Sequence, residues 1–173
     1  MVDLGCGTGT LAIGAAWLGA SRVFGVEMDP QALSVARENA RAAGVEVTWI
    51  EAELGAPKPL EVPAHADTVV MNPPFGAQRR HADRPFLDAA EGLLRPTLEG
   101  PPGAAGSSVP APGGALYLLA NSASQAFIER WSMARHLTIE EHRRSSWPLP
   151  RTFPHHREAR GQVEVDRWIL RRR

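Results

Sequence analysis

The four residues from Asn72 to Phe75, with the sequence Asn-Pro-Pro-Phe, are the part of the chain best suited to chemistry. The Asn72 side-chain oxygen and the Pro73 carbonyl can each accept a hydrogen bond from the same NH₂ group. An exocyclic amine such as that of adenine is a poor nucleophile, because its lone pair is delocalised into the ring. Two such hydrogen bonds pull the nitrogen toward tetrahedral geometry and aim its lone pair at an electrophilic methyl group.

The neighbours of Asn72 suit the same chemistry. Pro73 and Pro74 stiffen the turn, so the two acceptors are held in place before a substrate binds. Phe75 offers a face for an extruded base, and such stacking is worth roughly 1–3 kcal/mol. No general base is needed, because the proton can leave after the transfer. The alternative interpretation is an ordinary Pro-Pro turn that ends a strand.

A glycine-rich turn at the N-terminus predicts a nucleotide site. The sequence Asp-Leu-Gly-Cys-Gly-Thr-Gly at positions 3–9 follows a predicted strand and opens a predicted helix. Thr10 replaces the third glycine of the dinucleotide fingerprint. Glu27 ends the next strand, where a carboxylate can accept hydrogen bonds from both ribose hydroxyls, and Glu53 lies where an acceptor for an adenine amine is expected. The predicted cofactor contacts are Asp3, Gly5, Cys6, Gly7, Gly9, Glu27, Met28 and Glu53.

Two alternatives to this site remain open. Glu27 and Glu53 are also compatible with solvated loop carboxylates. An NAD-dependent dehydrogenase is the competing class for any glycine-rich turn, although the motif that begins at Asn72 argues against it.

Strand-like and helix-like segments alternate along the chain, which predicts a parallel sheet with crossover helices. Ligands bind at the carboxyl edge of such sheets, where both motifs are expected. Because residues 11–18 are almost entirely apolar, we expect their helix to be covered on most sides. The predicted strands are 1–4, 23–26, 45–50, 68–71, 115–119, 137–141 and 163–170, the last two antiparallel to each other. The predicted helices are 11–18, the segment from Asp29 as N-cap to Gly44 as stop, 83–94 and 125–135.

Two further groups of residues carry structural expectations. Residues 96–114 hold five prolines and five glycines and are expected to form a flexible insertion at the N-terminal edge of the sheet, without a catalytic role. Trp147 is ambiguous between a structural residue and a platform for a base. The tryptophans expected to be at least partly buried are Trp17, Trp49, Trp131 and Trp168.

Length and composition limit the class of protein. The 173 residues suit a single domain, and no apolar run approaches the roughly 20 residues of a membrane-spanning helix. Cys6 is the only cysteine, so no internal disulfide is possible and no zinc cluster is predicted. The pair His155-His156 has no further ligand at a suitable spacing, and no metal is expected. We therefore expect a soluble protein of the cytoplasm.

The formal net charge is zero, but the charges are unevenly distributed. Residues 1–67 hold nine acidic and four basic side chains, a net charge of −5. Residues 140–173 hold nine basic and five acidic side chains, a net charge of +4, and this part of the chain is suited to a polyanion. Scattered, solvated arginines are the alternative.

The order of these motifs resembles the class I S-adenosylmethionine (SAM)-dependent methyltransferases. This resemblance implies a Rossmann-like fold, with a mostly parallel seven-stranded sheet, helices on both faces and a reversed final hairpin. In detail the chain resembles the methyltransferase-like-five family, which methylates adenosine N6 in small-subunit ribosomal RNA. The resemblance rests on Val70 to Gly76, on Asp83 to Leu87, and on a tail with Leu149-Pro150, Phe153, His155 and the segment Val163-Glu164-Val165-Asp166.

The resemblance also implies substrate and partner contacts. The predicted catalytic residues are Asn72, Pro73, Pro74 and Phe75. The predicted substrate contacts are Phe75, Arg79, Arg80, Arg84, Arg151 and His155, with a solvated loop as the alternative for the first three arginines. A small zinc-binding activator of the Trm112 type is expected to add a strand at the edge formed by residues 45–50. Twist that protects a short edge is the alternative.

The chain departs from this family in two respects. Family members have an upstream segment that covers SAM, whereas this chain starts inside the first predicted strand, so we expect weaker SAM binding than in a longer version. The insertion at 96–114 is not typical of the family either. The alternatives for function are methylation of DNA adenine, guanine N2 or a protein glutamine through the same motif, or a non-catalytic scaffold that binds SAM or RNA.

Overall fold

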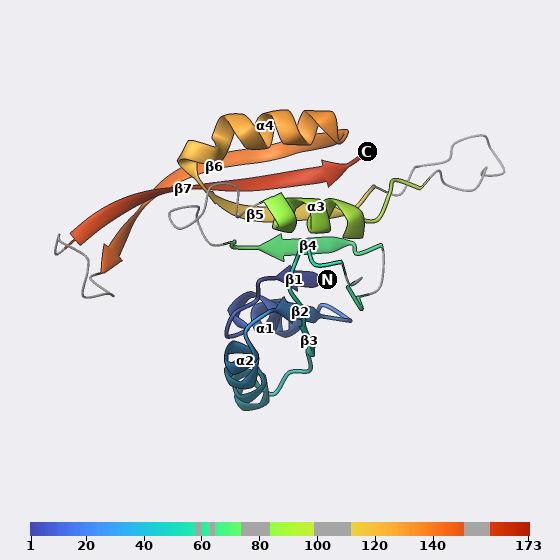
Figure 1. Ribbon diagram of the computed structural model, residues 1–173, viewed down its shortest axis with the longest axis vertical. Helices are drawn as coiled ribbons and strands as arrows, with labels where there is room; N and C mark the ends of the chain where they lie inside the picture. Colours follow the sequence, from blue (N-terminus) through green and yellow to red (C-terminus); the bar gives the residue numbers. More distant parts are fainter. Residues whose placement is uncertain (58–59, 63–64, 74–83, 99–111, 151–159) are drawn as a thin grey trace.

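The computed structural model describes residues 1–57, 60–62, 65–73, 84–98, 112–150 and 160–173, with side chains for all of these except 148–150 and 160–161. The described residues form one sheet of seven strands in the order β3-β2-β1-β4-β5-β7-β6 (Figure 1). The strands are β1 (Val2–Leu4), β2 (Phe24–Glu27), β3 (Thr48–Glu51), β4 (Thr68–Met71), β5 (Ala115–Asn121), β6 (Leu137–Pro150) and β7 (Arg160–Arg172). The helices are α1 (Thr10–Trp17), α2 (Pro30–Ala43), α3 (Arg84–Leu93) and α4 (Gln125–Ala134), preceded by the short 3-10 helix η1 (Ser122–Ser124).

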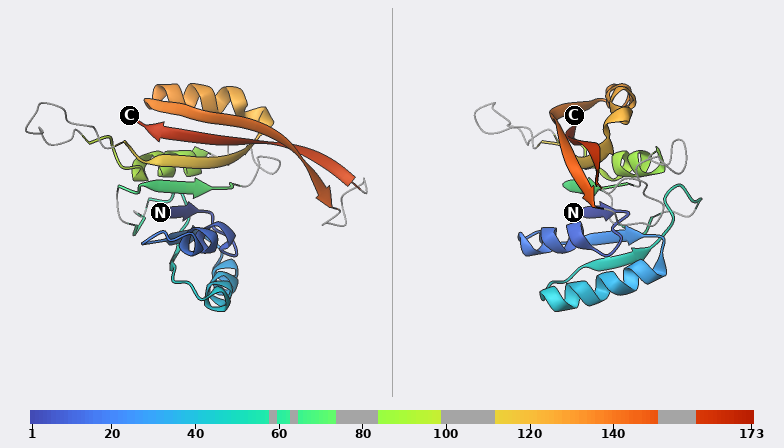
Figure 2. Two further views of the ribbon diagram at one scale, coloured as in Figure 1. Left: turned by 180° about the vertical axis from the view of Figure 1, so that it is seen from behind. Right: turned by 90° about the vertical axis from the view of Figure 1, so that its left-hand side faces the viewer.

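Strands β1 to β5 are parallel, and only β7 and β6 are antiparallel to their neighbours. The chain moves outward in one direction from β1 to β3 and in the other from β4 to β5. Because both sets of crossovers are right-handed, α1 and α2 pack on one face of the sheet and α3 on the other (Figure 2). The predicted α/β fold class and its reversed final hairpin are confirmed.

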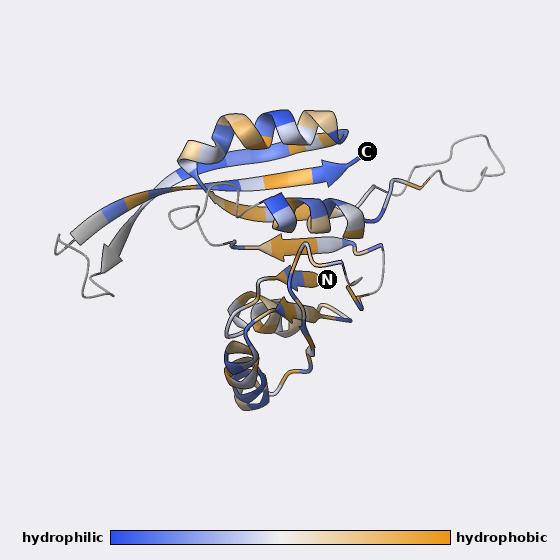
Figure 3. Cartoon of the chain, viewed as in Figure 1, coloured by the Kyte–Doolittle hydropathy of each residue, from blue (hydrophilic) through white to orange (hydrophobic). Residues whose placement is uncertain are grey.

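The core lies between the central strands and the helices α3 and α4. Strand β4 is mostly orange in Figure 3, whereas the coloured part of β6 is mostly hydrophilic. The fully buried side chains of this core include Leu4, Met71, Leu116, Ile128 and Trp168. The sheet that carries the carboxyl edge is therefore rigid where its strands meet α3 and α4.

Helix α2 forms as its sequence predicts. The Asp29 side chain accepts a hydrogen bond from the Gln31 backbone N–H at 2.8 Å, which caps the first turn. Gly44 ends the helix in the left-handed conformation, with φ of 67°. The side chains of Leu33, Ala36 and Ala40 form the buried stripe.

Helix α1 contradicts the expectation of a covered helix. Among its residues only Ala12 is buried, while Trp17 is 75 % exposed and Leu18, which caps the helix, is 92 % exposed. The prediction that Trp17 is at least partly buried was therefore wrong. Apolar composition shows what surroundings a side chain prefers, but burial requires a neighbouring element, and α1 contacts the sheet mainly through small side chains. The other three tryptophans expected to be at least partly buried, Trp49, Trp131 and Trp168, are so.

The final hairpin is much longer than predicted. Strands β6 and β7 pair from Leu137↔Arg172 to Pro150↔Arg160, whereas the sequence predicted only residues 137–141 and 163–170. The added residues are polar and arginine-rich, so they carry little of the apolar alternation that reveals a strand. Strand β3 is shorter than predicted but lies at the edge of the sheet, as expected.

The insertion at 96–114 is described only at its two ends. The Thr97 hydroxyl donates to the Arg172 carbonyl at 3.1 Å, and the Gly114 N–H donates to the Arg95 carbonyl at 2.7 Å. Both ends lie where β5 begins, which agrees with the expected position at the N-terminal edge. No helix among the described residues is long and apolar enough to cross a membrane.

Candidate cofactor and catalytic site

The glycine turn joins β1 to α1 through backbone conformations that other residues rarely adopt. Gly5, Gly7 and Gly9 have φ angles of 68°, 52° and 89°, all in the left-handed region. The Gly5 and Cys6 backbone N–H groups donate to the Val26 carbonyl at 2.8 and 3.0 Å, which fixes the turn to β2. The turn thus has a defined shape before any ligand binds.

Two aromatic side chains pack against this turn. A Cβ on Gly5 would lie 2.6 Å from Cε1 of Phe86 in α3, and a Cβ on Gly9 would lie 2.6 Å from Cη2 of Trp49 in β3. Both distances are too short for a real side chain, so these glycines are needed for space as well as for backbone angle. The sequence did not reveal either contact, because each joins residues that are far apart in the chain.

Glu27 is held by backbone N–H groups at the end of β2. One carboxylate oxygen accepts from the Gly7 N–H at 3.0 Å, and the other accepts from the N–H groups of Met28 and Asp29 at 2.8 and 3.1 Å. No cation pairs with Glu27 among the described residues. The carboxylate therefore sits beside the glycine turn, where it can accept hydroxyl hydrogen bonds from a ribose.

Asp3 is a second carboxylate beneath the turn, and it is only 1 % exposed. It accepts a hydrogen bond from the Ala12 N–H at 3.0 Å. Burial raises the pKa of Asp3 to about 7, and Glu27 adds to this rise, while the bond from Ala12 opposes it. A nearby positive charge would ionise Asp3 fully. Burial also raises the pKa of the Cys6 thiol to about 12, so Cys6 is a neutral residue of the turn.

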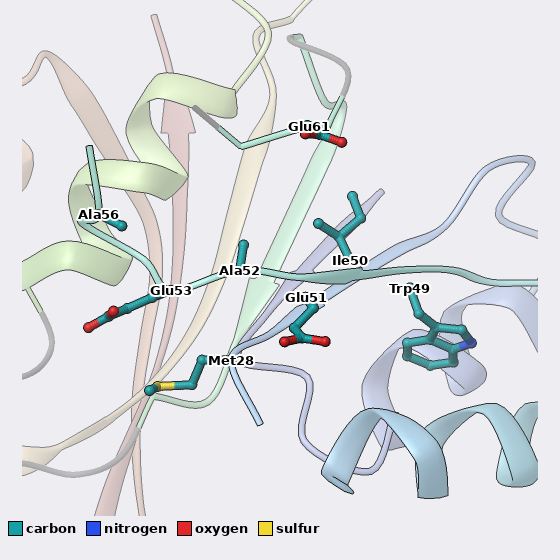
Figure 4. A pocket seen from close by; sticks show the side chains of 8 residues that line it. All are labelled: Met28, Trp49, Ile50, Glu51, Ala52, Glu53, Ala56 and Glu61. Carbon is teal, nitrogen blue, oxygen red and sulfur yellow. The ribbon is translucent and has the colours of Figure 1, made fainter. Parts of the chain in front are cut away.

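A cavity of about 520 Å³ opens beside Met28 and the end of β3 (Figure 4). In the figure Ile50 and Ala52 point to one side of the β3 backbone and Glu51 points to the other. Glu51 pairs in register with Glu27, so both acids end neighbouring strands at the carboxyl edge. Glu53, the predicted acceptor, lines the cavity, and so does Glu51, which was not predicted although it ends its strand as Glu27 does. The cavity is lined by Met28, Trp49, Ile50, Glu51, Ala52, Glu53, Ala56 and Glu61.

These residues fit SAM. The left-handed turn admits a ligand close to the backbone, Glu27 offers acceptors for a ribose, and the cavity has the size and the acidic rim for an adenine amine. Asp3 lies beneath the same turn and has no cation partner among the described residues, which suits the ammonium group of a methionine tail. Each predicted cofactor residue thus lies at or next to one site.

Asn72 leaves the sheet directly beside this site. Leu4 and Met71 are paired across β1 and β4, so Gly5 and Asn72, the residues that follow them, emerge side by side at the carboxyl edge. Asn72 is exposed to solvent, whereas Pro73 is buried. The exposed amide next to the glycine turn can therefore reach a ligand held there.

The remaining predicted substrate residues fall mostly outside the described part of the chain. These are Pro74, Phe75, Arg79, Arg80, Arg151 and His155. Arg84 is described and begins α3, where its guanidinium lies 5.4 Å from the centre of the Phe127 ring. This cation–π contact holds Arg84 on α4. No group of three or more potential metal ligands occurs among the described residues.

Comparison with known proteins shows that the chain is similar to methyltransferases. The family model for ribosomal protein L11 methyltransferase (PrmA) matches residues 1–73. An uncharacterised protein of Methanocaldococcus jannaschii is 41 % identical over 102 residues, which cover 52 % of this chain and 44 % of that protein. The ribosomal protein L11 methyltransferase of Aeromonas hydrophila is 46 % identical over 109 residues, 57 % of this chain and 36 % of its own. The chain thus spans less than half of the length of these two relatives.

The solved structures extend the similarity over the whole chain. A Pyrococcus horikoshii protein assigned as an RNA methyltransferase superposes with a TM-score of 0.76 and 29 % identity, covering 99 % of this chain and 73 % of that one. The match includes the final hairpin as well as the glycine turn. The chain therefore has the fold of the class I SAM-dependent methyltransferases, and this similarity points to SAM as the cofactor.

Proposed function

We propose that the chain transfers the methyl group of SAM to the N6 amine of adenosine in RNA, most specifically in small-subunit ribosomal RNA. One observation carries the proposal: Asn72 emerges beside Gly5, because Leu4 and Met71 are paired in register. An amide acceptor is thereby placed next to the cofactor turn, where an amine that is to be methylated must bind.

One group of residues binds the cofactor and another binds the substrate amine. Bound SAM supplies an electrophilic methyl group on a sulfonium. Glu27 holds the ribose hydroxyls, and Asp3 lies beneath the turn that receives the methionine end. Asn72 and the Pro73 carbonyl accept hydrogen bonds from the substrate NH₂ and direct its lone pair toward the methyl group. The new N–C bond would form as the bond between sulfur and the methyl carbon breaks and leaves a neutral thioether. The nitrogen would release one proton to solvent afterwards, so no base is required.

RNA is favoured over a protein substrate by how strong each similarity is over the whole chain. The ribosomal protein L11 methylase of Lactobacillus delbrueckii covers 99 % of this chain with a TM-score of 0.65 and 19 % identity. The Pyrococcus horikoshii protein covers the same share with a TM-score of 0.76 and 29 % identity. Methylation of a ribosomal protein is the second candidate, because the Aeromonas hydrophila enzyme is 46 % identical over the aligned residues.

The test presents both substrate classes to the purified chain with isotopically labelled SAM. Deproteinised ribosomal RNA and ribosomal proteins are supplied in separate reactions, and the products are identified by mass spectrometry of nucleosides and of tryptic peptides. N6-methyladenosine is the expected product. N2-methylguanosine, or label in a protein alone, would overturn the adenine assignment.

The substitution Asn72→Ala tests whether the Asn72 side chain accepts a hydrogen bond from the substrate amine. We expect turnover to fall at least about 100-fold, as when one pre-positioned hydrogen bond to a reacting group is lost. SAM affinity by calorimetry should stay unchanged, because Asn72 faces the substrate. Asn121→Ala is the matched control: Asn121 ends the neighbouring strand β5, and its side chain accepts from the Ala123 N–H at 2.9 Å. A parallel loss of SAM binding in Asn72→Ala would contradict this role.

We further propose that the edge of β3 binds an activator of the Trm112 type by strand addition. Strand β3 pairs only with β2 in the described sheet, and residues 45–49 border a cavity of about 610 Å³. Arg22, Arg37 and Arg41 line the same cavity, which favours an acidic partner. Native mass spectrometry of the mixed proteins tests this, and separate masses at micromolar concentration would contradict it.

A further inference from the structure

The final hairpin continues beyond the sheet as a two-stranded ribbon. Asn121, the last residue of β5, pairs with Val165 of β7. The next five pairs, from Ser146↔Glu164 to Pro150↔Arg160, have no third strand beside them among the residues that the structure describes. We call residues 146–150 and 160–164 the arm. At about 3.4 Å per residue, five pairs extend roughly 17 Å past the end of β5.

The arm projects from the edge that carries the candidate catalytic turn. Met71 of β4 pairs with Leu118 of β5, so Asn72 lies level with Leu119, two residues before β5 ends. The arm therefore begins just beyond the level of Asn72 and extends away from the sheet on the substrate side. Figures 1 and 2 both show β6 and β7 reaching past the carboxyl ends of β4 and β5.

The base of the arm is fixed by a buried carboxylate. Asp166 is 0 % exposed and accepts two hydrogen bonds from Arg144, from Nε at 2.8 Å and from Nη2 at 3.0 Å. Nε2 of His142 lies 3.1 Å from the second oxygen of Asp166, and the His142 ring stacks on Trp168 with centroids 3.8 Å apart. Arg144 also donates to Gln125 at 2.8 Å, which ties the hairpin to α4. A two-stranded ribbon is marginally stable alone, so this anchoring sets its direction.

The exposed side chains near the base of the arm suit a nucleic acid. All five residues from Arg143 to Trp147 are exposed. Because side chains alternate along a strand, Arg143, Ser145 and Trp147 share one face. Glu141 pairs with both Arg143, at 3.3 Å, and Arg167, so two guanidinium groups share one carboxylate. This leaves a surplus positive charge on the face.

Trp147 is the unusual member of this group. It is 50 % exposed and lies opposite Val163 in the arm. A large flat ring in this position buries little surface in the fold, but it offers a platform on which a base can stack. An arginine on the same face supplies the contact that a backbone phosphate needs.

We propose that the arm and its base form a second substrate contact, in which Trp147 of the arm stacks on a nucleobase near the target and Arg143 at the base contacts the backbone of single-stranded RNA. This inference rests on the proposed function, since it assumes an RNA substrate. It assigns Trp147 to substrate binding and not to the chemical step. A flat ring beside surplus guanidinium charge favours RNA over a peptide, for which stacking platforms are not required.

The test measures binding of a fluorescein-labelled single-stranded RNA by fluorescence anisotropy, without SAM turnover. Trp147→Ala should raise the dissociation constant about tenfold or more, while Trp147→Phe, which keeps a stacking ring, should retain most of the affinity. Trp17→Ala is the matched control: Trp17 is more exposed than Trp147, but it ends α1, which runs away from the carboxyl edge. It should bind RNA like the unmodified chain.

The outcomes separate this inference from the proposed function. Unchanged RNA affinity in Trp147→Ala overturns the arm contact, even if the chain makes N6-methyladenosine. Weakened affinity in Trp147→Ala with no methylated RNA supports the arm contact and counts against the proposed function. Equal losses in the Ala and Phe variants, with a lowered melting temperature, would show a structural role and overturn the stacking role. A Trp147-dependent affinity for a ribosomal protein alone would overturn the RNA assignment.

Discussion

The two halves of the sheet hold their carboxylates in different ways. On the cofactor side, Glu27 is bound by three backbone N–H groups and Asp3 by one. On the hairpin side, Asp166 is bound by Arg144 and Glu140 by Arg171. Backbone groups orient a carboxylate without cancelling its charge, whereas arginine neutralises it. The cofactor side is thus left able to attract a cationic ligand, while these two carboxylates of the hairpin side are neutralised within the fold.

The largest effect is expected where the backbone-held carboxylate is changed. Glu27→Gln removes the charge and places an amide donor against backbone donors, so SAM affinity should fall about 10- to 100-fold, equivalent to about 1.4–2.7 kcal/mol. Isothermal titration calorimetry measures this directly. Glu38→Gln, on the exposed face of α2, is the matched control and should bind SAM normally. Unaltered binding in Glu27→Gln would remove Glu27 from the site.

A smaller effect is expected at the arginine-held carboxylate, and it falls on stability. Hydrogen bonds from Arg144 hold the pKa of Asp166 below its usual range, so this interaction stabilises the fold above the unfolded pKa of 3.8 and is lost as the pH falls below it. Asp166→Asn should lower the free energy of unfolding at pH 7 by about 2 kcal/mol. SAM affinity should not change. Denaturant unfolding measures the loss, with the exposed Glu38→Gln as a control that should unfold like the unmodified chain.

The smallest expected effect is a pH dependence that comes from Asp3. Burial raises its pKa from 3.8 to about 7, so between these values the folded chain holds a proton that the unfolded chain has released. The unfolding free energy therefore decreases as the pH rises through 7, by about 1 kcal/mol between pH 6 and pH 8. Asp3→Asn should lack this component. Urea titrations of both proteins at the two pH values measure the difference, and parallel curves would contradict the raised pKa.

The parts of the fold that local sequence signals determine were predicted well. Strand β4 has its predicted bounds, and α2 begins after Asp29 and ends at Gly44, because caps and breakers act within a few residues. The exposure of Trp17 and the length of β6 were predicted wrongly. Both depend on neighbours distant in sequence: Trp17 lacks a covering element, and the polar residues of β6 extend because β7 pairs with them.

The site shows the same division. The glycine turn, Glu27 and Asn72 were predicted from residue type and spacing. The structure brings all three to one edge of the sheet. Phe86 and Trp49, which pack against the turn, were not identified as part of the site, because their contacts with Gly5 and Gly9 cross the fold. Contacts of this kind leave no periodic signal in one sequence.

The strand order has an electrical consequence. It places the described residues of the acidic segment 1–67 mainly at the β3 side and those of the basic segment 140–173 at the β6 side, so opposite charges are separated across the width of the sheet. Such a molecule has a dipole moment although its net charge is zero. A polyanion approaching by diffusion would be turned toward the arm before it touches the protein, and added salt would slow that encounter. A protein with zero net charge can therefore still orient a charged partner as the two approach each other.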